Sequence, residues 1–120
     1  MSDLTKTVKL RINITPEQTE LFRQMTEQYR QACNFVSQYI FDNQFDLAYL
    51  SLNRVLYAEI RSRFGLKSQM AQSSIKTVIA KYKTVKQQLL QRPYKYKDEK
   101  GNWKYITKTL EWLWKPVFFG

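Results

Sequence analysis

Hydrophobic and polar residues alternate near the start of the chain. In residues 7–14 the even positions are apolar and the odd positions are polar. A period of two is typical of a β-strand that buries one face. The sequence therefore predicts a half-buried strand over residues 7–14.

Two stretches after this strand repeat apolar residues at helical spacing. The first is predicted to run from Pro16 to about Asp42, with a capping box of Thr15 and Gln18. The second is predicted to begin after an N-cap at Ser51 and to end at a left-handed Gly65. The predicted buried stripes are Leu21, Phe22, Met25, Tyr29, Cys33, Val36 and Ile40 in the first helix, and Leu52, Val55, Leu56, Ile60 and Phe64 in the second.

A third helix is predicted from an N-cap at Ser68 to about Gln91, before Pro93 ends it. Three lysines of this helix fall outside its apolar stripe and are predicted to give it a basic side. The stripe consists of Ala71, Ile75, Val78, Ile79, Tyr82, Val85 and Leu89, and the lysines are Lys76, Lys83 and Lys86.

The tail changes to β patterning. Aromatic residues and lysines alternate in residues 94–97 and 103–105, with a turn-rich stretch between them. This pattern predicts a hairpin with aromatics on one face and lysines on the other. The apolar run at 110–119 is predicted to be a strand of a sheet whose remainder lies beyond Gly120. The expected fold class is α+β, with three helices inserted between strands of one sheet or barrel.

Composition and charge indicate what kind of partner the chain binds. The length of 120 residues fits one domain, and an aromatic content of 15% argues against disorder throughout. The net charge is +10, but the first 60 residues carry −1 and the last 60 carry +11. So uneven a charge indicates a polyanionic partner, and a basic surface without a ligand is the alternative.

The residue types argue against catalysis by this chain. It has no histidine, one cysteine and no Gly-rich phosphate loop, and its ten acidic residues do not converge by spacing. We therefore expect no catalytic site, metal or cofactor. Cys33 is expected to be a small buried group. No apolar run could span a membrane, so we expect no membrane partner and a cytoplasmic location.

Three groups of residues are candidates for binding nucleic acid. Cations neutralise phosphates, Gln side chains can read adenine edges at a helix start, and aromatic rings stack on bases. A solvated surface, ordinary capping and sheet packing are the respective alternatives. The candidates are Arg61, Arg63, Lys67, Ser68, Gln69, Gln72, Lys76, Lys83, Lys86, Lys95, Lys97 and Lys104, with Tyr94, Tyr96, Trp103 and Tyr105 for base stacking.

Several motifs occur in an order that is similar to one known family. They are residues 7–18, Tyr29, residues 33–36 (Cys-Asn-Phe-Val), residues 72–75 (Gln-Ser-Ser-Ile), Tyr82-Lys83 and residues 114–116 (Trp-Lys-Pro). Over nearly its whole length, the chain resembles the N-terminal part of the TnpB-type (OrfB-type) transposon-encoded proteins, relatives of type V CRISPR effectors. These proteins are RNA-guided DNA endonucleases.

The resemblance implies a division of the chain. Residues 1–15 and 92–120 would belong to an incomplete, OB-like wedge β-barrel, and residues 16–91 to an inserted helical recognition domain, also described as a helix-turn-helix. Guide RNA and target DNA are the implied partners, in a prokaryotic cytoplasm and close to the nucleoid. Gln72 matches the position that reads the target-adjacent motif, while Ser68 and Gln69 differ in residue type from the family.

Cleavage in this family belongs to a RuvC domain with three acidic residues and magnesium, joined to a zinc-finger element. The sequence ends before both, so we expect this chain to bind but not to cut. Two other functions stay open: a stand-alone helix-turn-helix-like DNA-binding regulator, and an aromatic-rich protein-interaction module. Exposure of Trp112, Trp114, Phe118 and Phe119 would favour that module or a truncated chain.

Overall fold

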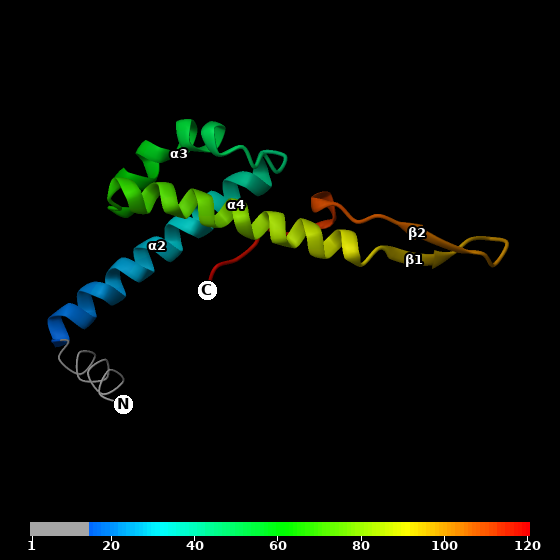
Figure 1. The fold of residues 1–120 in the computed structure, drawn as a ribbon, viewed down its shortest axis with the longest axis horizontal. Helices are drawn as coiled ribbons and strands as arrows, with labels where there is room; N and C mark the ends of the chain where they lie inside the picture. The colour runs from blue at the N-terminus through cyan, green and yellow to red at the C-terminus, as the bar shows by residue number, and fades with distance from the viewer. Residues whose placement is uncertain (1–14) are drawn as a thin grey trace, which may run out of the picture.

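The computed structural model describes residues 15–120, which form three helices followed by a two-stranded antiparallel hairpin (Figure 1). Residues 15–120 are mostly helical and contain no β-barrel. The strand predicted over residues 7–14 lies outside the described part. The elements are α2 (Pro16–Asp42), α3 (Tyr49–Phe64), α4 (Ser68–Gln91), β1 (Tyr94–Lys97), β2 (Trp103–Ile106) and the short 3-10 helix η1 (Leu110–Trp112).

The capping box predicted at the start of α2 is confirmed. The Thr15 hydroxyl accepts the backbone N–H of Gln18 at 3.1 Å, and the Gln18 side chain accepts the N–H of Thr15 at 3.1 Å. The predicted end of α3 is confirmed as well, because Gly65 adopts a left-handed conformation with φ of 65° and donates its N–H to the carbonyl of Arg61. A three-residue turn, 65–67, then leads into α4.

The serine caps predicted for the other two helices are wrong. Ala48 caps α3, where the Asp46 carboxylate accepts the Ala48 N–H at 3.0 Å and allows the helix to begin before Ser51. Lys67 caps α4, and Ser68 is its first residue. The Ser68 hydroxyl is bonded to the Tyr57 hydroxyl at 2.6 Å, so it joins two helices instead of capping one.

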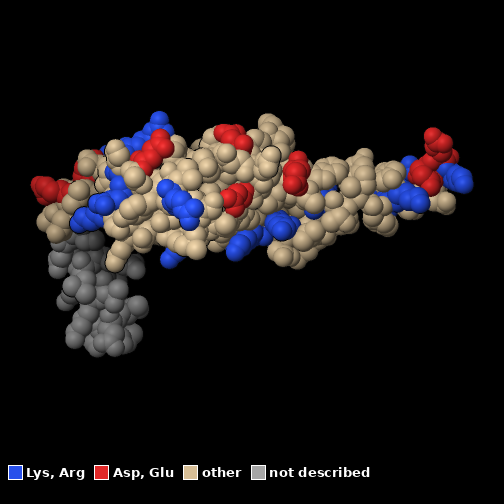
Figure 2. Space-filling view, turned by 90° about the horizontal axis from the view of Figure 1, so that it is seen from above, with Lys and Arg blue, Asp and Glu red and all other residues tan. Residues whose placement is uncertain are grey.

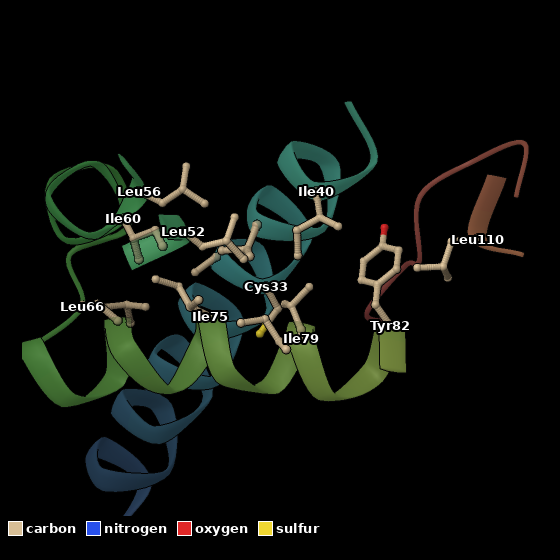
Figure 3. Close-up of a cluster of buried hydrophobic side chains, with 14 residues drawn as sticks. Cys33, Ile40, Leu52, Leu56, Ile60, Leu66, Ile75, Ile79, Tyr82 and Leu110 are labelled. Carbon is tan, nitrogen blue, oxygen red and sulfur yellow. The ribbon is translucent and has the colours of Figure 1, made fainter. Parts of the chain in front are cut away.

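The core lies where α4 packs against both α2 and α3 (Figure 3). The stripe predicted for α4 is buried from Ala71 to Tyr82, and its last two members are half-buried. The other helices contribute buried Ala32, Cys33, Val36 and Ile40 from α2, and Leu52, Leu56 and Ile60 from α3.

Part of the predicted core is exposed. Leu21, Phe22 and Met25 lie on the first half of α2, which extends past α3 and α4 (Figure 1). Val55 is exposed on α3. Helical spacing correctly identified the apolar face of α2, but within residues 15–120 a neighbouring helix covers only the second half of that face.

Cys33 is buried as predicted, and its burial gives a first test. Burial raises the pKa of the Cys33 thiol to about 11, while a hydrogen bond with Tyr29 acts in the opposite direction. At pH 8 only about one thiol in a thousand would then be ionised, and the thiolate is the nucleophile. We expect Cys33 to resist iodoacetamide at pH 8 in the folded protein and to react within minutes in 6 M guanidinium. Equal labelling rates in both conditions would contradict the buried position.

The C-terminal run is not a strand, contrary to the prediction. After η1, an irregular segment packs against α2 and α4. The Asn34 side chain accepts the N–H of Phe119 at 2.6 Å and donates to its carbonyl at 2.9 Å. Ser37 donates to the Val117 carbonyl, and the Tyr82 hydroxyl accepts the Val117 N–H at 3.2 Å. Side chains of the helices therefore satisfy backbone groups that a neighbouring strand would otherwise pair.

Candidate nucleic-acid interface

Cations dominate one continuous stretch of the chain. Between Glu59 and Asp98 the sequence has ten Lys or Arg residues and no acidic residue. This stretch includes the end of α3, all of α4 and all of β1. Within residues 15–120 its only ion pair joins Arg63 to Glu59. Most of this positive charge is therefore uncompensated by neighbouring carboxylates, and Figure 2 shows cations from the bundle to the tip of the hairpin.

One side of α4 gathers four of the candidate residues. Gln69, Gln72, Lys76 and Lys83 follow each other at intervals of three, four and seven, which places them on the same helical face. All of them are exposed except Gln72, which is partly exposed. The Lys76 ammonium lies 5.1 Å from the centre of the Tyr49 ring, so this face, here called the α4 face, borders α3.

Lys86 stands at the edge of the α4 face. It follows Lys83 by three residues, which is a rotation of about 60° around the helix. The pKa of Glu111 in η1 is lowered, chiefly by a hydrogen bond with Thr109, then by a backbone hydrogen bond, and to the smallest extent by the charge of Lys86. Within residues 15–120 no ion pair joins Lys86 to a carboxylate.

The turn between α3 and α4 forms a shallow cavity of about 500 Å³. Arg61 and Lys67 both line it, and the Arg61 guanidinium lies 5.8 Å from the centre of the Tyr57 ring. Arg63 is placed differently. Its guanidinium lies 5.0 Å from the centre of the Phe35 ring and 3.6 Å from the Glu59 carboxylate. Because the Glu59 carboxylate partly compensates its charge, Arg63 is the weakest of the basic candidates.

The register of the hairpin overturns the prediction for its two faces. Lys95 pairs with Tyr105 and Lys97 with Trp103, while Tyr94 pairs with Ile106 and Tyr96 with Lys104. Directly opposed residues of an antiparallel pair share a face. One face therefore carries Lys95, Lys97, Trp103 and Tyr105, and the other carries Tyr94, Tyr96, Lys104 and Ile106.

The five-residue loop 98–102 is the reason for this mixing. It brings odd positions of β1 opposite odd positions of β2. The aromatic residues occupy even positions in β1 but odd positions in β2, so they end on opposite faces. A loop with one residue more or fewer would have separated aromatics from lysines. The sequence pattern alone does not reveal whether odd positions of β1 lie opposite odd or even positions of β2.

Each face of the hairpin combines rings with cations. The Lys95 ammonium lies 4.4 Å from the Trp103 ring centre and 5.9 Å from that of Tyr105, and Lys97 lies 4.9 Å from Trp103. On the other face, Tyr94 stacks on Tyr96 with a centroid distance of 6.1 Å. All eight strand residues are exposed. Since an isolated two-stranded hairpin is marginally stable, this surface is well suited to a partner.

The hairpin tip is organised by Asp98. Its carboxylate accepts the backbone N–H of Lys100 at 2.9 Å and that of Asn102 at 2.8 Å, and Gly101 takes a positive φ of 81°. Asp98 therefore has a structural role in the turn. Across residues 15–120, no group of three His, Cys, Asp or Glu side chains is placed to hold a metal ion.

Several exposed cations are not among the binding residues that the sequence predicts. Arg92 lies between α4 and β1, Lys100 lies at the hairpin tip, and Lys81 lies on the side of α4 away from Lys83. The signal that could have identified Lys81 and Arg92 is the acid-free stretch itself. The exposed aromatics at the C-terminus include Trp112, Trp114 and Phe118, while Phe119 is half-buried.

In the part of the chain that the structure describes, no helix is both long and apolar enough to cross a membrane.

Comparison with known proteins identifies no relative. The sequence matches no family model, no curated protein and no solved structure.

Proposed function

We propose that the chain is the nucleic-acid-binding N-terminal region of a TnpB-type RNA-guided DNA endonuclease, which contacts guide RNA and the target-adjacent DNA motif. The observation that carries this proposal is the acid-free stretch between Glu59 and Asp98, whose ten cations extend over α4 and β1. Cations of this kind neutralise phosphates and release counterions, which supplies affinity for either nucleic acid. Cleavage would belong to a RuvC domain outside this chain.

The α4 face is the proposed contact with DNA. Gln69 and Gln72 stand in the first turns of α4, and a Gln side chain can bond both the N6 and N7 groups of adenine. Lys76 and Lys83 continue along the same face and would contact phosphates. Such a division between base-reading amides and positioning cations is common in protein–DNA interfaces.

The hairpin is the proposed contact with RNA. It would be part of a wedge-type barrel to which residues 1–15 and 92–120 contribute. Its two strands are exposed on both faces, which supports the idea that further strands or a ligand cover it. Residues 16–91 would then be the inserted recognition domain.

The α4 face can be tested with two lysines of one helix. Lys83→Gln and Lys81→Gln remove the same charge from exposed positions of α4, but 200° of helical rotation separates these positions. We expect Lys83→Gln to weaken binding of a 20-base-pair duplex about fivefold and to lower the salt slope by about 1. Lys81→Gln should change the affinity less than twofold. Fluorescence anisotropy between 50 and 300 mM salt measures both quantities.

Two outcomes would count against the proposal. If neither duplex DNA nor structured RNA binds with a salt-dependent affinity, the chain is not a nucleic-acid-binding region. If the two lysine variants lose affinity equally, the positive charge acts as a diffuse field and the α4 face is not the contact.

A stand-alone helix-turn-helix-like DNA-binding regulator is the second candidate. The turn 65–67 between α3 and α4 has three residues and contains Gly65, as is common in this motif. This candidate predicts tight, sequence-selective binding of duplex DNA, and structured RNA should not displace the bound duplex. If structured RNA at an equal phosphate concentration displaces the duplex, the first proposal is favoured instead.

A further inference from the structure

We propose that one face of the hairpin, formed by Lys95, Lys97, Trp103 and Tyr105 and here called the lysine–tryptophan face, is a binding site for single-stranded nucleic acid. This inference rests on the proposed function and narrows it, because it assigns one strand type to one surface. The observation behind it is the register, which places two exposed rings and two cations on the same side.

The spacing of the rings selects an unstacked strand. Trp103 and Tyr105 are 53% and 62% exposed and stand two residues apart in β2, so their rings project about 6.8 Å apart, at about 3.4 Å per residue. Bases in a duplex are spaced about 3.4 Å along each strand and remain stacked on each other. A duplex therefore cannot offer one base to each ring, whereas a single strand can open to this distance.

The cations already on the rings can be exchanged for bases. The Lys95 and Lys97 ammonium groups lie 4.4 Å and 4.9 Å from the Trp103 ring centre, in exposed contacts that are weak because water screens the charges. A base that stacks on the ring covers its whole face and makes a stronger contact than one exposed ammonium. A base can therefore displace an ammonium from the Trp103 ring. The released Lys95 and Lys97 remain on the same face, beside the phosphates of the bound strand.

The opposite face is less suited to the same ligand. There the Tyr94 ring packs against Tyr96 at 6.1 Å and against Trp112 at 5.7 Å, so its faces are occupied by other rings. Lys104 is the only cation of that face. The nearby carboxylate of Asp98 is bonded to backbone N–H groups of the turn and does not lie on either strand.

The test compares single strands with a duplex on the full 120-residue chain. Labelled 12-mers of uridine and of thymidine are bound by anisotropy at 100 mM salt, beside a 12-base-pair duplex. We expect both single strands to bind at least fivefold more tightly to the wild type than the duplex does. A tighter uridine strand would name RNA as the natural source of the ligand, and a tighter thymidine strand would name DNA.

Two substitutions locate the site. Trp103→Ala should weaken single-strand binding about tenfold and duplex binding less than twofold. Its matched control is Trp114→Ala, because Trp114 is an exposed tryptophan outside the hairpin with the Lys115 ammonium 4.9 Å from its ring centre. The control should change single-strand affinity less than twofold. Trp103→Phe, which retains a ring and β propensity, should keep affinity within threefold of the wild type.

The two lysines of this face provide an independent test if Trp103→Ala disturbs the hairpin. Lys95→Gln combined with Lys97→Gln leaves both rings in place and should lower the single-strand salt slope by about 1.4, twice the value of about 0.7 for one phosphate. Lys104→Gln on the other face should lower it by less than 0.3.

The inference is overturned if the duplex binds as tightly as the single strands, or if Trp103→Ala and Trp114→Ala have equal effects, or if the slope is unchanged in the double lysine variant. In each of these cases salt-dependent duplex binding can persist, so the broader proposed function would survive. Absence of binding by every oligonucleotide overturns both.

Discussion

Replacement of Leu56 by Ala is expected to lower the free energy of unfolding by about 3 kcal/mol. Leu56 is 1% exposed and belongs to the cluster in which α3 packs against α4 and α2 (Figure 3). Removal of a buried leucine side chain loses its transfer free energy and leaves a cavity, at a cost of about 2–5 kcal/mol. Urea unfolding followed by circular dichroism at 222 nm measures the change.

The same helix offers a matched control. Leu50 is 76% exposed, also in α3, and Leu50→Ala should change the free energy of unfolding by less than about 0.5 kcal/mol. Both substitutions are leucine to alanine in a helix, so helix propensity changes little and similarly. Similar losses in the two variants would mean that α3 does not bury the face described here.

Replacement of Tyr82 by Phe is expected to cost about 2 kcal/mol and to loosen the C-terminal segment. The buried Tyr82 hydroxyl bonds the Ser37 side chain at 2.9 Å, donates to the Ser37 carbonyl at 3.1 Å and accepts the Val117 N–H at 3.2 Å. Phe keeps the ring but leaves the carbonyl and the N–H without this partner, and an unmade buried hydrogen bond costs about 1–3 kcal/mol.

Hydrogen exchange separates this local effect from general destabilisation. At about 1.4 kcal/mol per factor of ten, the Val117 amide should exchange about thirtyfold faster in Tyr82→Phe. Tyr105→Phe removes a hydroxyl from an exposed ring on the hairpin and should leave both the stability and the Val117 exchange rate unchanged. An unaltered Val117 rate in Tyr82→Phe would show that the segment is held by other contacts.

The candidate site was only partly readable from the sequence. The lysines of the α4 face were identifiable because residues outside an apolar helical stripe must lie on another side. The two faces of the hairpin were predicted wrongly, because a strand pattern gives the side of each residue within its own strand but not the register with its partner.

Local physics determined the three helices, their lengths and most of their ends. The capping box at Thr15, the left-handed Gly65 and the apolar period of α4 each depend on residues within one or two turns, so the sequence alone identified them. Tertiary structure decided which apolar residues are covered. Phe22 and Ile40 share the apolar face of α2, yet only Ile40 lies against neighbouring helices.

The same distinction explains the C-terminal segment. Its partners Asn34 and Ser37 are 80 or more residues away in sequence, and no local pattern encodes a contact at that distance. The apolar run at 110–119 therefore indicated burial but not the form that burial takes. The sequence by itself determined the helices, because their hydrogen bonds are local. Only the tertiary structure decided the register of the hairpin, the exposed half of α2 and the docking of the last residues, because each of these depends on residues that are distant in sequence.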